Sequence, residues 1–276
     1  GIGPHKKGYT VLEKEYNEDG YVSLERYFDA SFEPVAISNM FQKQMEYDEV
    51  GNLICETALD TEGVRMMTDD GYCEHHMSYN EDGRKISDWY CGLDGEAVMY
   101  RGNYAKIEQR YDENGKVIQQ SFFGTRGQGV MVNRRQTLLR VYNDDGRIIQ
   151  ESYYDIRGNA SPNYQNYSAV NRTYDEQGRL MQEAYYNLAD GSPVNSRQGY
   201  SSVIAQYDEN DSAISRQYWD ASGRPAYVSG VFQVTADYDE MGNLTAERYF
   251  DVDGNFTLND AGTAGVTYRY DANGYA

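Results

Sequence analysis

Apolar residues occur in short runs along the whole chain, and polar turn residues bound each run. A representative run begins with an aliphatic pair, such as Ile148-Ile149, and ends with an aromatic pair, such as Tyr153-Tyr154. No segment keeps the spacing of three and four residues that is typical of an amphipathic helix. The pattern therefore predicts β-strands that run from the aliphatic pair to the aromatic pair.

The strands belong to a repeat that is anchored on a Tyr followed by Asp or Asn. Successive anchors are 31 to 33 residues apart, and a Gly stands four residues after each anchor except at Asp211. Asp or Asn before a Gly favours a tight turn, because the side chain bonds to the backbone and Gly accepts a positive φ. We therefore expect each anchor to end one strand of a hairpin. The anchors are Tyr16, Tyr47, Tyr79, Tyr111, Tyr142, Tyr174, Tyr207, Tyr238 and Tyr270.

A single hairpin of this size is too small to be stable alone, so each unit must bury its apolar face against its neighbours. We predict an all-β fold, an elongated β-solenoid of tandem hairpin repeats with a period of about 32 residues. A β-propeller is the alternative, although its blades usually need more residues. Residues 1–276 are expected to form one array of about eight repeats. Because neither end has a polar capping sequence, we expect a fragment of a longer array.

Composition narrows the classes of partner. The chain has 25 Lys and Arg against 44 Asp and Glu, a net charge of −19, which disfavours binding to nucleic acid or to anionic membranes. No apolar run is long enough to insert into a membrane as a helix. The 28 tyrosines suit strands. Three cysteines, Cys55, Cys73 and Cys91, do not predict a disulfide framework.

No residues with the pattern of a catalytic site are evident. The histidines are His5, His75 and His76, and the sequence Cys-Glu-His-His at 73–76 could supply zinc ligands. It occurs once and lacks a partner pair, so we interpret it as variation on a solvent-facing strand. Segments such as Asp-Glu-Asn-Gly lack the later bidentate Glu of a calcium loop and are interpreted as turns. The sequence predicts a chain that is not an enzyme and that has no metal site and no cofactor.

The aromatic pair supplies the candidate binding site. Its two members lie on opposite faces of a strand. The second member varies among Phe, Leu, Cys, Tyr and Trp, so we expect it in the core, and truncation of Tyr186 or Trp219 should then be costly. The first member is mostly Tyr, which suits a partly exposed row that binds sugar rings or a partner protein. The alternative is that these rings only pack against neighbours on the sheet. The candidate ligand-binding residues are Tyr27, Tyr90, Tyr153, Tyr185, Tyr218 and Tyr249.

An acidic residue stands nine positions after most anchors. In stacked units these residues would fall on one line, and we interpret the line as a solvated strand face with Lys or Arg beside it. The residues are Glu25, Glu56, Asp88, Glu151, Glu183 and Glu247.

The Tyr-Asp anchors with a Gly four residues later, repeated through a Tyr-rich β pattern, resemble the YD or RHS-like repeats of bacterial surface and secreted proteins. The resemblance covers essentially the whole chain, with a longer period. It implies an extracellular or cell-surface, non-catalytic module that is attached to further domains. We predict binding to a polysaccharide, such as a cell-wall or host glycan, or to a surface protein. The alternative is a structural spacer, shell or adhesion repeat without a small ligand.

Overall fold

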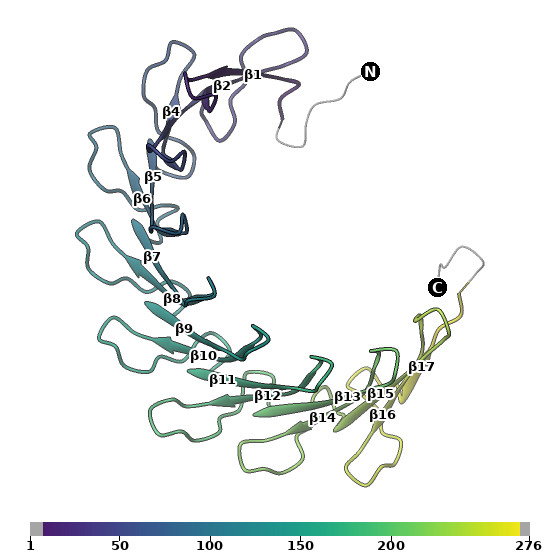
Figure 1. Ribbon diagram of the computed structural model, residues 1–276. Helices are drawn as coiled ribbons and strands as arrows, with labels where there is room; N and C mark the ends of the chain where they lie inside the picture. The colour runs from purple at the N-terminus through teal and green to yellow at the C-terminus, as the bar shows by residue number, and fades with distance from the viewer. Residues whose placement is uncertain (1–7, 271–276) are drawn as a thin grey trace. The chain divides into compact units, whose positions relative to one another are not determined.

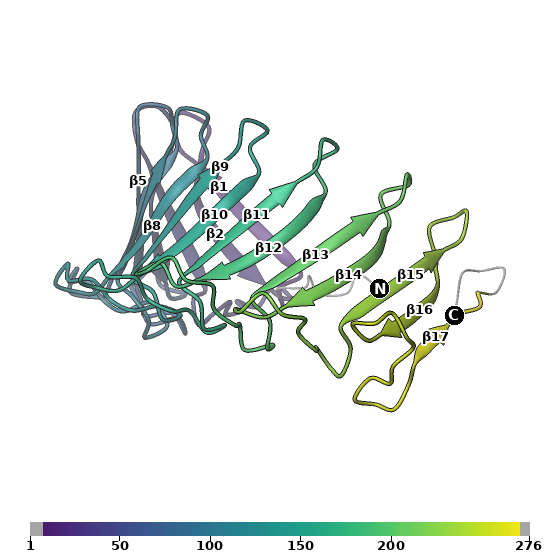
Figure 2. The same ribbon diagram turned by 90° about the horizontal axis from the view of Figure 1, so that it is seen from below.

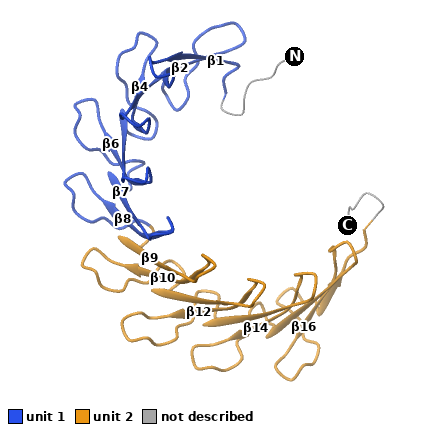
Figure 3. Cartoon of the chain, in the orientation of Figure 1, with its two compact units in different colours: residues 1–132 blue, residues 133–276 orange. Residues whose placement is uncertain are grey.

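A computed structural model describes residues 8–270 (Figure 1). The chain divides into two compact units, residues 1–132 and residues 133–276 (Figure 3). Both units contain the same kind of hairpin repeat, and all regular elements of the described residues are β-strands. The all-β class expected from the sequence is confirmed. The expectation that residues 1–276 form one array stays a prediction.

Unit 1 consists of four consecutive hairpins. In each hairpin a strand of six residues is followed by a strand of seven, and the anchor Tyr ends the first strand. The strands are β1 (Val11–Tyr16), β2 (Val22–Phe28), β3 (Gln42–Tyr47), β4 (Leu53–Leu59), β5 (Glu74–Tyr79), β6 (Lys85–Cys91), β7 (Lys106–Tyr111) and β8 (Val117–Phe123).

Unit 2 repeats this arrangement, and Figure 2 shows its strands side by side in chain order. Its strands are β9 (Thr137–Tyr142), β10 (Ile148–Tyr154), β11 (Ala169–Tyr174), β12 (Leu180–Tyr186), β13 (Ser202–Tyr207), β14 (Ala213–Trp219), β15 (Gln233–Tyr238), β16 (Leu244–Phe250) and β17 (Gly265–Thr267).

Within each unit the hairpins join edge to edge into an open antiparallel sheet. In the hairpin of β11 and β12, pairing runs from Ala169↔Tyr186 to Tyr174↔Leu180, with a bulge beside the anchor. A shorter ladder connects β12 to the next hairpin, from Gln182↔Ile204 to Ala184↔Ser202. Every described strand pairs with a strand that precedes or follows it in the chain, as in a β-solenoid of tandem hairpins. The four-stranded blades of the alternative propeller are not found among the described strands.

The turns have the chemistry expected from the sequence. Oδ1 of Asp175, directly after an anchor, accepts hydrogen bonds from the backbone N–H of Gln177 and Arg179, at 3.1 and 2.8 Å. Gly178 follows with φ of +84°. Asp211 replaces the usual Gly and still adopts φ of +65°, as expected. The second turn of several repeats uses the same geometry, for example at Asp155. The turn assignment is confirmed.

The second-turn aspartates predict a specific sensitivity to acid. Backbone N–H groups bond to the carboxylates of Asp155, Asp220 and Asp251 and lower their pKa from 3.8. A lowered pKa in the folded state adds stability above pH 3.8 that is lost as the pH falls through the folded pKa. Asn keeps the acceptor oxygen without the charge. A variant with Asn at all three positions should therefore lose stability less steeply below about pH 4 in acid titrations followed by circular dichroism.

The control for this prediction is Asp253→Asn. Asp253 is exposed, and it contributes its backbone N–H to the turn, as a donor to Asp251 Oδ1. An acid titration of the triple variant that superimposes on that of this control would contradict the assignment.

Within each unit, the anchor Tyr connects a hairpin to the hairpin before it. The hydroxyl of Tyr174 donates a hydrogen bond of 2.9 Å to the carbonyl oxygen of Ile148, which begins the second strand of the preceding hairpin. The same bond, with lengths between 2.7 and 3.2 Å, recurs in both units. The Tyr hydroxyl can donate to this carbonyl oxygen, whereas Phe has no hydroxyl. The bond therefore explains why the anchor position is Tyr. The other bonds are Tyr47 to Val22, Tyr79 to Leu53, Tyr111 to Lys85, Tyr207 to Leu180, Tyr238 to Ala213 and Tyr270 to Leu244.

Tyr174→Phe is therefore expected to lower the free energy of unfolding by about 1 kcal/mol, the usual contribution of one such hydrogen bond. Urea denaturation measures the change. Tyr16→Phe is the matched control, because Tyr16 is 61% exposed and no described hairpin precedes it. Equal effects of the two substitutions would show that the bond between hairpins does not stabilise the array.

Candidate functional site

The first members of the aromatic pairs lie in the interior. Tyr27, Tyr90, Tyr153 and Tyr185 are buried, and Tyr218 and Tyr249 are half-buried. The second members are mostly more exposed, as Tyr154 and Tyr186 show. The predicted exposed row of tyrosines is therefore wrong, and the expected order of the two faces is reversed. The first-position residues, with the acidic residues two positions before them, form what we call the tyrosine face.

The chain that returns from the second turn covers the tyrosine face. The backbone N–H of Val194 bonds to the carbonyl oxygen of Tyr185, and Val35 bonds to Tyr27 in the same way. The irregular segment thereby folds over the first-position ring. Strand alternation places the two members of a pair on opposite faces, but the path of this segment decides which face is interior.

Aromatic rings pack against one another in series along much of the tyrosine face. In unit 2 the ring of Tyr167, seven residues before an anchor, lies between those of Tyr153 and Tyr185, with centroids 6.1 and 4.4 Å away. Tyr200 lies in the same way between Tyr185 and Tyr218, at 5.7 and 5.0 Å. Each ring from the irregular segment therefore joins two successive hairpins. Such aromatic pairs contribute more free energy than the burial of their apolar area alone would give.

Unit 1 has the same stack. Tyr72 packs against Tyr90 at 5.1 Å, and Tyr104 lies between Tyr90 and Phe122 at 6.1 and 5.3 Å. The His75 ring also stacks on Tyr90, at 4.7 Å and nearly parallel. The aromatic stack is therefore a property of both units.

The tyrosine hydroxyls have partners inside the fold. The hydroxyl of Tyr185 donates to Glu183 Oε1 at 2.6 Å, and that of Tyr27 donates to Glu25 Oε2 at 3.0 Å. Burial, with these carboxylates, raises the pKa of both phenols, and burial raises that of Tyr153 to about 12. These hydroxyls therefore stay protonated as donors. For Tyr27, Tyr185 and Tyr249 the acceptor is a glutamate two residues away on the same face, which favours Tyr over Phe at these positions.

The acidic line expected on a solvated face lies on the tyrosine face and is partly or fully buried, so that interpretation is wrong. In unit 2, Arg172 lies between two carboxylates, with its Nη1 3.2 Å from Glu151 Oε2 and its Nε 2.7 Å from Glu183 Oε2. Arg140 Nε contacts the other oxygen of Glu151 at 2.9 Å. Acidic and basic groups thus alternate across successive strands, and we call this row the ion ladder.

In unit 1 the ion ladder runs through a histidine. Lys43 Nζ bonds to Glu56 Oε1 at 2.8 Å, and Glu56 Oε2 lies 3.4 Å from His75 Nδ1. His75 Nε2 lies 2.8 Å from Asp88 Oδ1, which also accepts from Lys85. The hydrogen bond with His75 is the main cause that lowers the pKa of Glu56 to about 2. Both ring nitrogens of His75 are engaged, so the arrangement suits a structural role better than proton exchange with a substrate.

A basic residue two or four positions before an anchor was the signal that sequence reasoning missed. Lys43, Arg140 and Arg172 stand at these positions, and in the strand register they lie opposite Glu25, Glu151 and Glu183, respectively. Considered with the acidic line, they could have predicted an ion ladder within the sheet.

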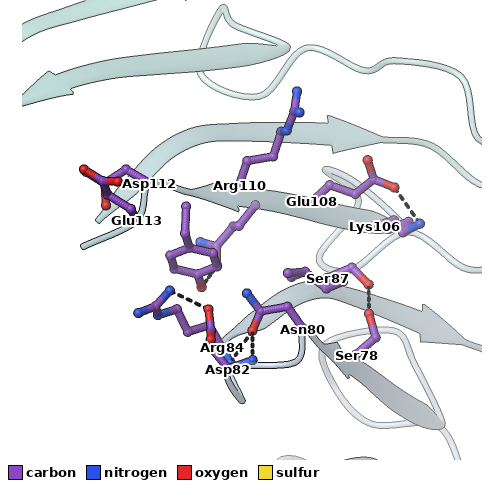
Figure 4. Close-up of a pocket in the computed structure, with 13 residues that line it drawn as sticks. Ser78, Asn80, Asp82, Arg84, Ser87, Lys106, Glu108, Arg110, Asp112 and Glu113 are labelled. Carbon is purple, nitrogen blue, oxygen red and sulfur yellow. Dashed lines mark hydrogen bonds and ion pairs between the residues drawn. The ribbon is translucent and has the colours of Figure 1, made fainter. Parts of the chain in front are cut away.

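Unit 1 also has an open groove beside β5, β6 and β7 (Figure 4). Much of its polar lining is already joined in pairs, with Ser78 bonded to Ser87, Arg84 to Asp82 and Lys106 to Glu108. Charges of both signs alternate along it. The groove therefore offers no concentrated charge to a charged ligand.

The Cys-Glu-His-His segment divides between two faces of the sheet. His75 belongs to the ion ladder, whereas Glu74 and His76 lie on the opposite face with Cys91 of the neighbouring strand. One ligand atom from each of these three residues lies within 4.8 Å of the others. Of the described residues, they are the group that could hold a metal ion. His5 lies outside the described residues.

Comparisons with known proteins give matches of low structural similarity. No protein-family model and no curated protein matches the chain. A crystal structure of TcdB2-TccC3-TEV is 13% identical, with a TM-score of 0.46, and the match covers 95% of this chain and 12% of that chain. A Photorhabdus luminescens Tc holotoxin pore is 16% identical, with a TM-score of 0.38, 92% of this chain covered and 14% of that chain. This chain thus spans 12% to 14% of the length of these chains.

No helix with the length and apolar character that a bilayer crossing needs occurs among residues 8–270.

Proposed function

We propose that the chain is a non-catalytic structural segment, a wall or spacer of tandem hairpins within a larger extracellular or cell-surface protein. The observation that carries the proposal is the burial of the tyrosine face. The side chains that recur in nearly every unit connect hairpin to hairpin, through stacked rings, ion pairs and the anchor hydroxyl. A repeated side chain that bonds within the sheet supports an architectural role.

The argument for glycan binding by the first-position tyrosines required exposed rings, and these rings are buried or half-buried. A sugar ring stacks on an exposed aromatic face, whereas Tyr185 is buried, with its ring stacked on Tyr167 and in tilted contact with Tyr200. Its hydroxyl is bonded to Glu183. The partners that suit this chain are further domains of the same protein and other proteins, with no nucleic acid.

Deletion of one whole unit tests the architectural role. Removal of residues 175–207 joins Tyr174 to Asp208, so that one anchor replaces the next and the strand order is preserved. Since each hairpin contacts only its neighbours, we expect this variant to fold cooperatively with circular dichroism like that of the parent. Removal of residues 175–190 deletes β12 and should prevent folding of the surrounding hairpins. Equal failure of both deletions would contradict a modular array.

A glycan-array screen separates this function from the alternative. We expect no glycan to bind above background. Specific binding to one glycan class that Tyr185→Phe or Tyr218→Phe weakens would overturn the structural proposal and favour a carbohydrate-binding module.

A further inference from the structure

We infer that Glu74, His76 and Cys91 form a binding site for a single Zn²⁺ ion on the face of unit 1 opposite the tyrosine face. Glu74 and His76 are two residues apart on β5, so their side chains lie on the same face. Cys91 on β6 is directly opposite Glu74 in the strand register. Thiolate, imidazole and carboxylate are the groups that Zn²⁺ binds in proteins.

The distances suit an ion after small side-chain movements. The three ligand atoms lie within 4.8 Å of one another, and His76 Nε2 is 3.0 Å from Glu74 Oε2. Ligand atoms around a tetrahedral zinc are about 3.5 Å apart, given bond lengths of about 2.0–2.3 Å. An ion would replace the hydrogen bond between His76 and Glu74 and would draw Cys91 inward. Three protein ligands would leave a fourth position for water.

Neighbouring groups hold the ligands in a suitable orientation. Arg65 Nη1 contacts Glu74 Oε1 at 2.9 Å, so one oxygen of the carboxylate is held while the other faces His76. The Trp89 ring stacks on the imidazole of His76 at 5.1 Å and 8°. Partners of this kind orient the ligands of metal sites and limit their movement. Glu74 and Cys91 are also buried, which shields two ligands from water.

The site is specific to the repeat that contains β5 and β6. Cys91 stands at the second position of the aromatic pair, where most other units have Phe, Tyr or Trp. A thiol is much smaller than these rings, so this repeat has room for an ion where most other repeats have an aromatic side chain. The positions of Glu74 and His76 in the next hairpin hold Lys106 and Glu108, which already pair with each other. A metal site in this one repeat is therefore independent of the structural role that all the repeats share.

Adjacent residues supply matched controls, because the segment 73–76 contributes to both faces. His75 and Cys73 are close in sequence to the proposed ligands, but His75 belongs to the ion ladder and Cys73 Sγ lies against the Ala58 carbonyl oxygen. His76→Gln is therefore compared with His75→Gln, and Cys91→Ser with Cys73→Ser. Glu74→Gln is the further variant should Cys91→Ser fail to fold.

The experiment titrates the tag-free, reduced full chain with Zn²⁺ by calorimetry and with Co²⁺ by absorption. We expect one equivalent of Zn²⁺ to bind, and Co²⁺ to produce a thiolate-to-metal charge-transfer band in the near ultraviolet. His76→Gln, Cys91→Ser and Glu74→Gln should lose at least tenfold in affinity, and the two controls should bind like the parent. Absence of saturable binding by the parent, or the charge-transfer band surviving Cys91→Ser, would overturn the site. Equal losses in ligand and control variants would overturn it as well.

Discussion

Tyr185→Ala is expected to lower the free energy of unfolding by about 3–5 kcal/mol, the usual effect of removing a large buried ring. The Tyr185 side chain is 5% exposed and packs with Val170, Tyr200 and Ala226 in the core of unit 2. Its removal breaks the aromatic stack at the point where Tyr167 and Tyr200 both rest on it. Chemical denaturation followed by circular dichroism measures the loss.

Two substitutions control this result. Tyr186→Ala should be clearly less costly, because the Tyr186 ring is half-exposed on the opposite face. Tyr185→Phe keeps the ring and removes only the hydrogen bond to Glu183, so it should cost about 1 kcal/mol. A larger loss for Tyr186→Ala than for Tyr185→Ala would show that the core lies on the other face of the sheet.

Arg172→Met is expected to cost on the order of 2 kcal/mol, because it leaves two carboxylates without their shared cation. The Arg172 side chain is 19% exposed and contacts both Glu151 and Glu183. Solvent screens such a group less than an ion pair on the surface. Urea denaturation at low and at high salt should therefore give similar losses for this variant.

Arg248→Met is the matched control for the ion ladder. Arg248 also lies on a strand and contacts a carboxylate, that of Asp237, but both side chains are well exposed. Pairs of this kind contribute about 0–1 kcal/mol. The double variant Arg172→Met/Glu183→Gln should recover part of the lost free energy of unfolding, because it no longer buries the unpaired carboxylate of Glu183. Equal costs for Arg172→Met and Arg248→Met would indicate that the ion ladder adds no stability.

The repeat and its turns could be predicted from the sequence because their causes are local. The Tyr-Asp anchor and the Gly four residues later correspond to one turn, whose carboxylate bonds and positive φ involve residues only a few positions apart. The hairpin follows from this turn, and the stacking of hairpins follows from their small size. The all-β tandem class therefore needed no information on long-range contacts.

The interior face could not be predicted in the same way. Strand alternation separates Tyr185 from Tyr186, but the side that becomes buried depends on the path of the irregular segment near Val194. That segment has no simple periodicity. The second position was interpreted as the core because it accepts Leu, Cys and Phe. Leu59 and Cys91 are buried there, but the aromatic residues at this position are only partly buried, so its composition does not identify the interior face.

The sequence did not identify the proposed group of metal ligands, for a related reason. The sequence places His75 next to His76, which suggests a pair of ligands, but the strand sends the two imidazoles to opposite faces. The third proposed ligand, Cys91, comes from the neighbouring strand, and only the register brings it opposite Glu74. A register is set by the turn, so a search of opposing positions across each predicted hairpin would have found the group.

The anchor bond gives the array a direction. Within a unit, a hairpin donates a hydroxyl to the hairpin before it, as Tyr174 does, and presents a carbonyl to the hairpin after it, as Leu180 does. The two edges of any hairpin are therefore chemically different, and a copy of the same repeat can join only head to tail. Two arrays that meet with like edges would leave these groups unmatched. Directionality of this kind favours extension along one axis over association into symmetric pairs.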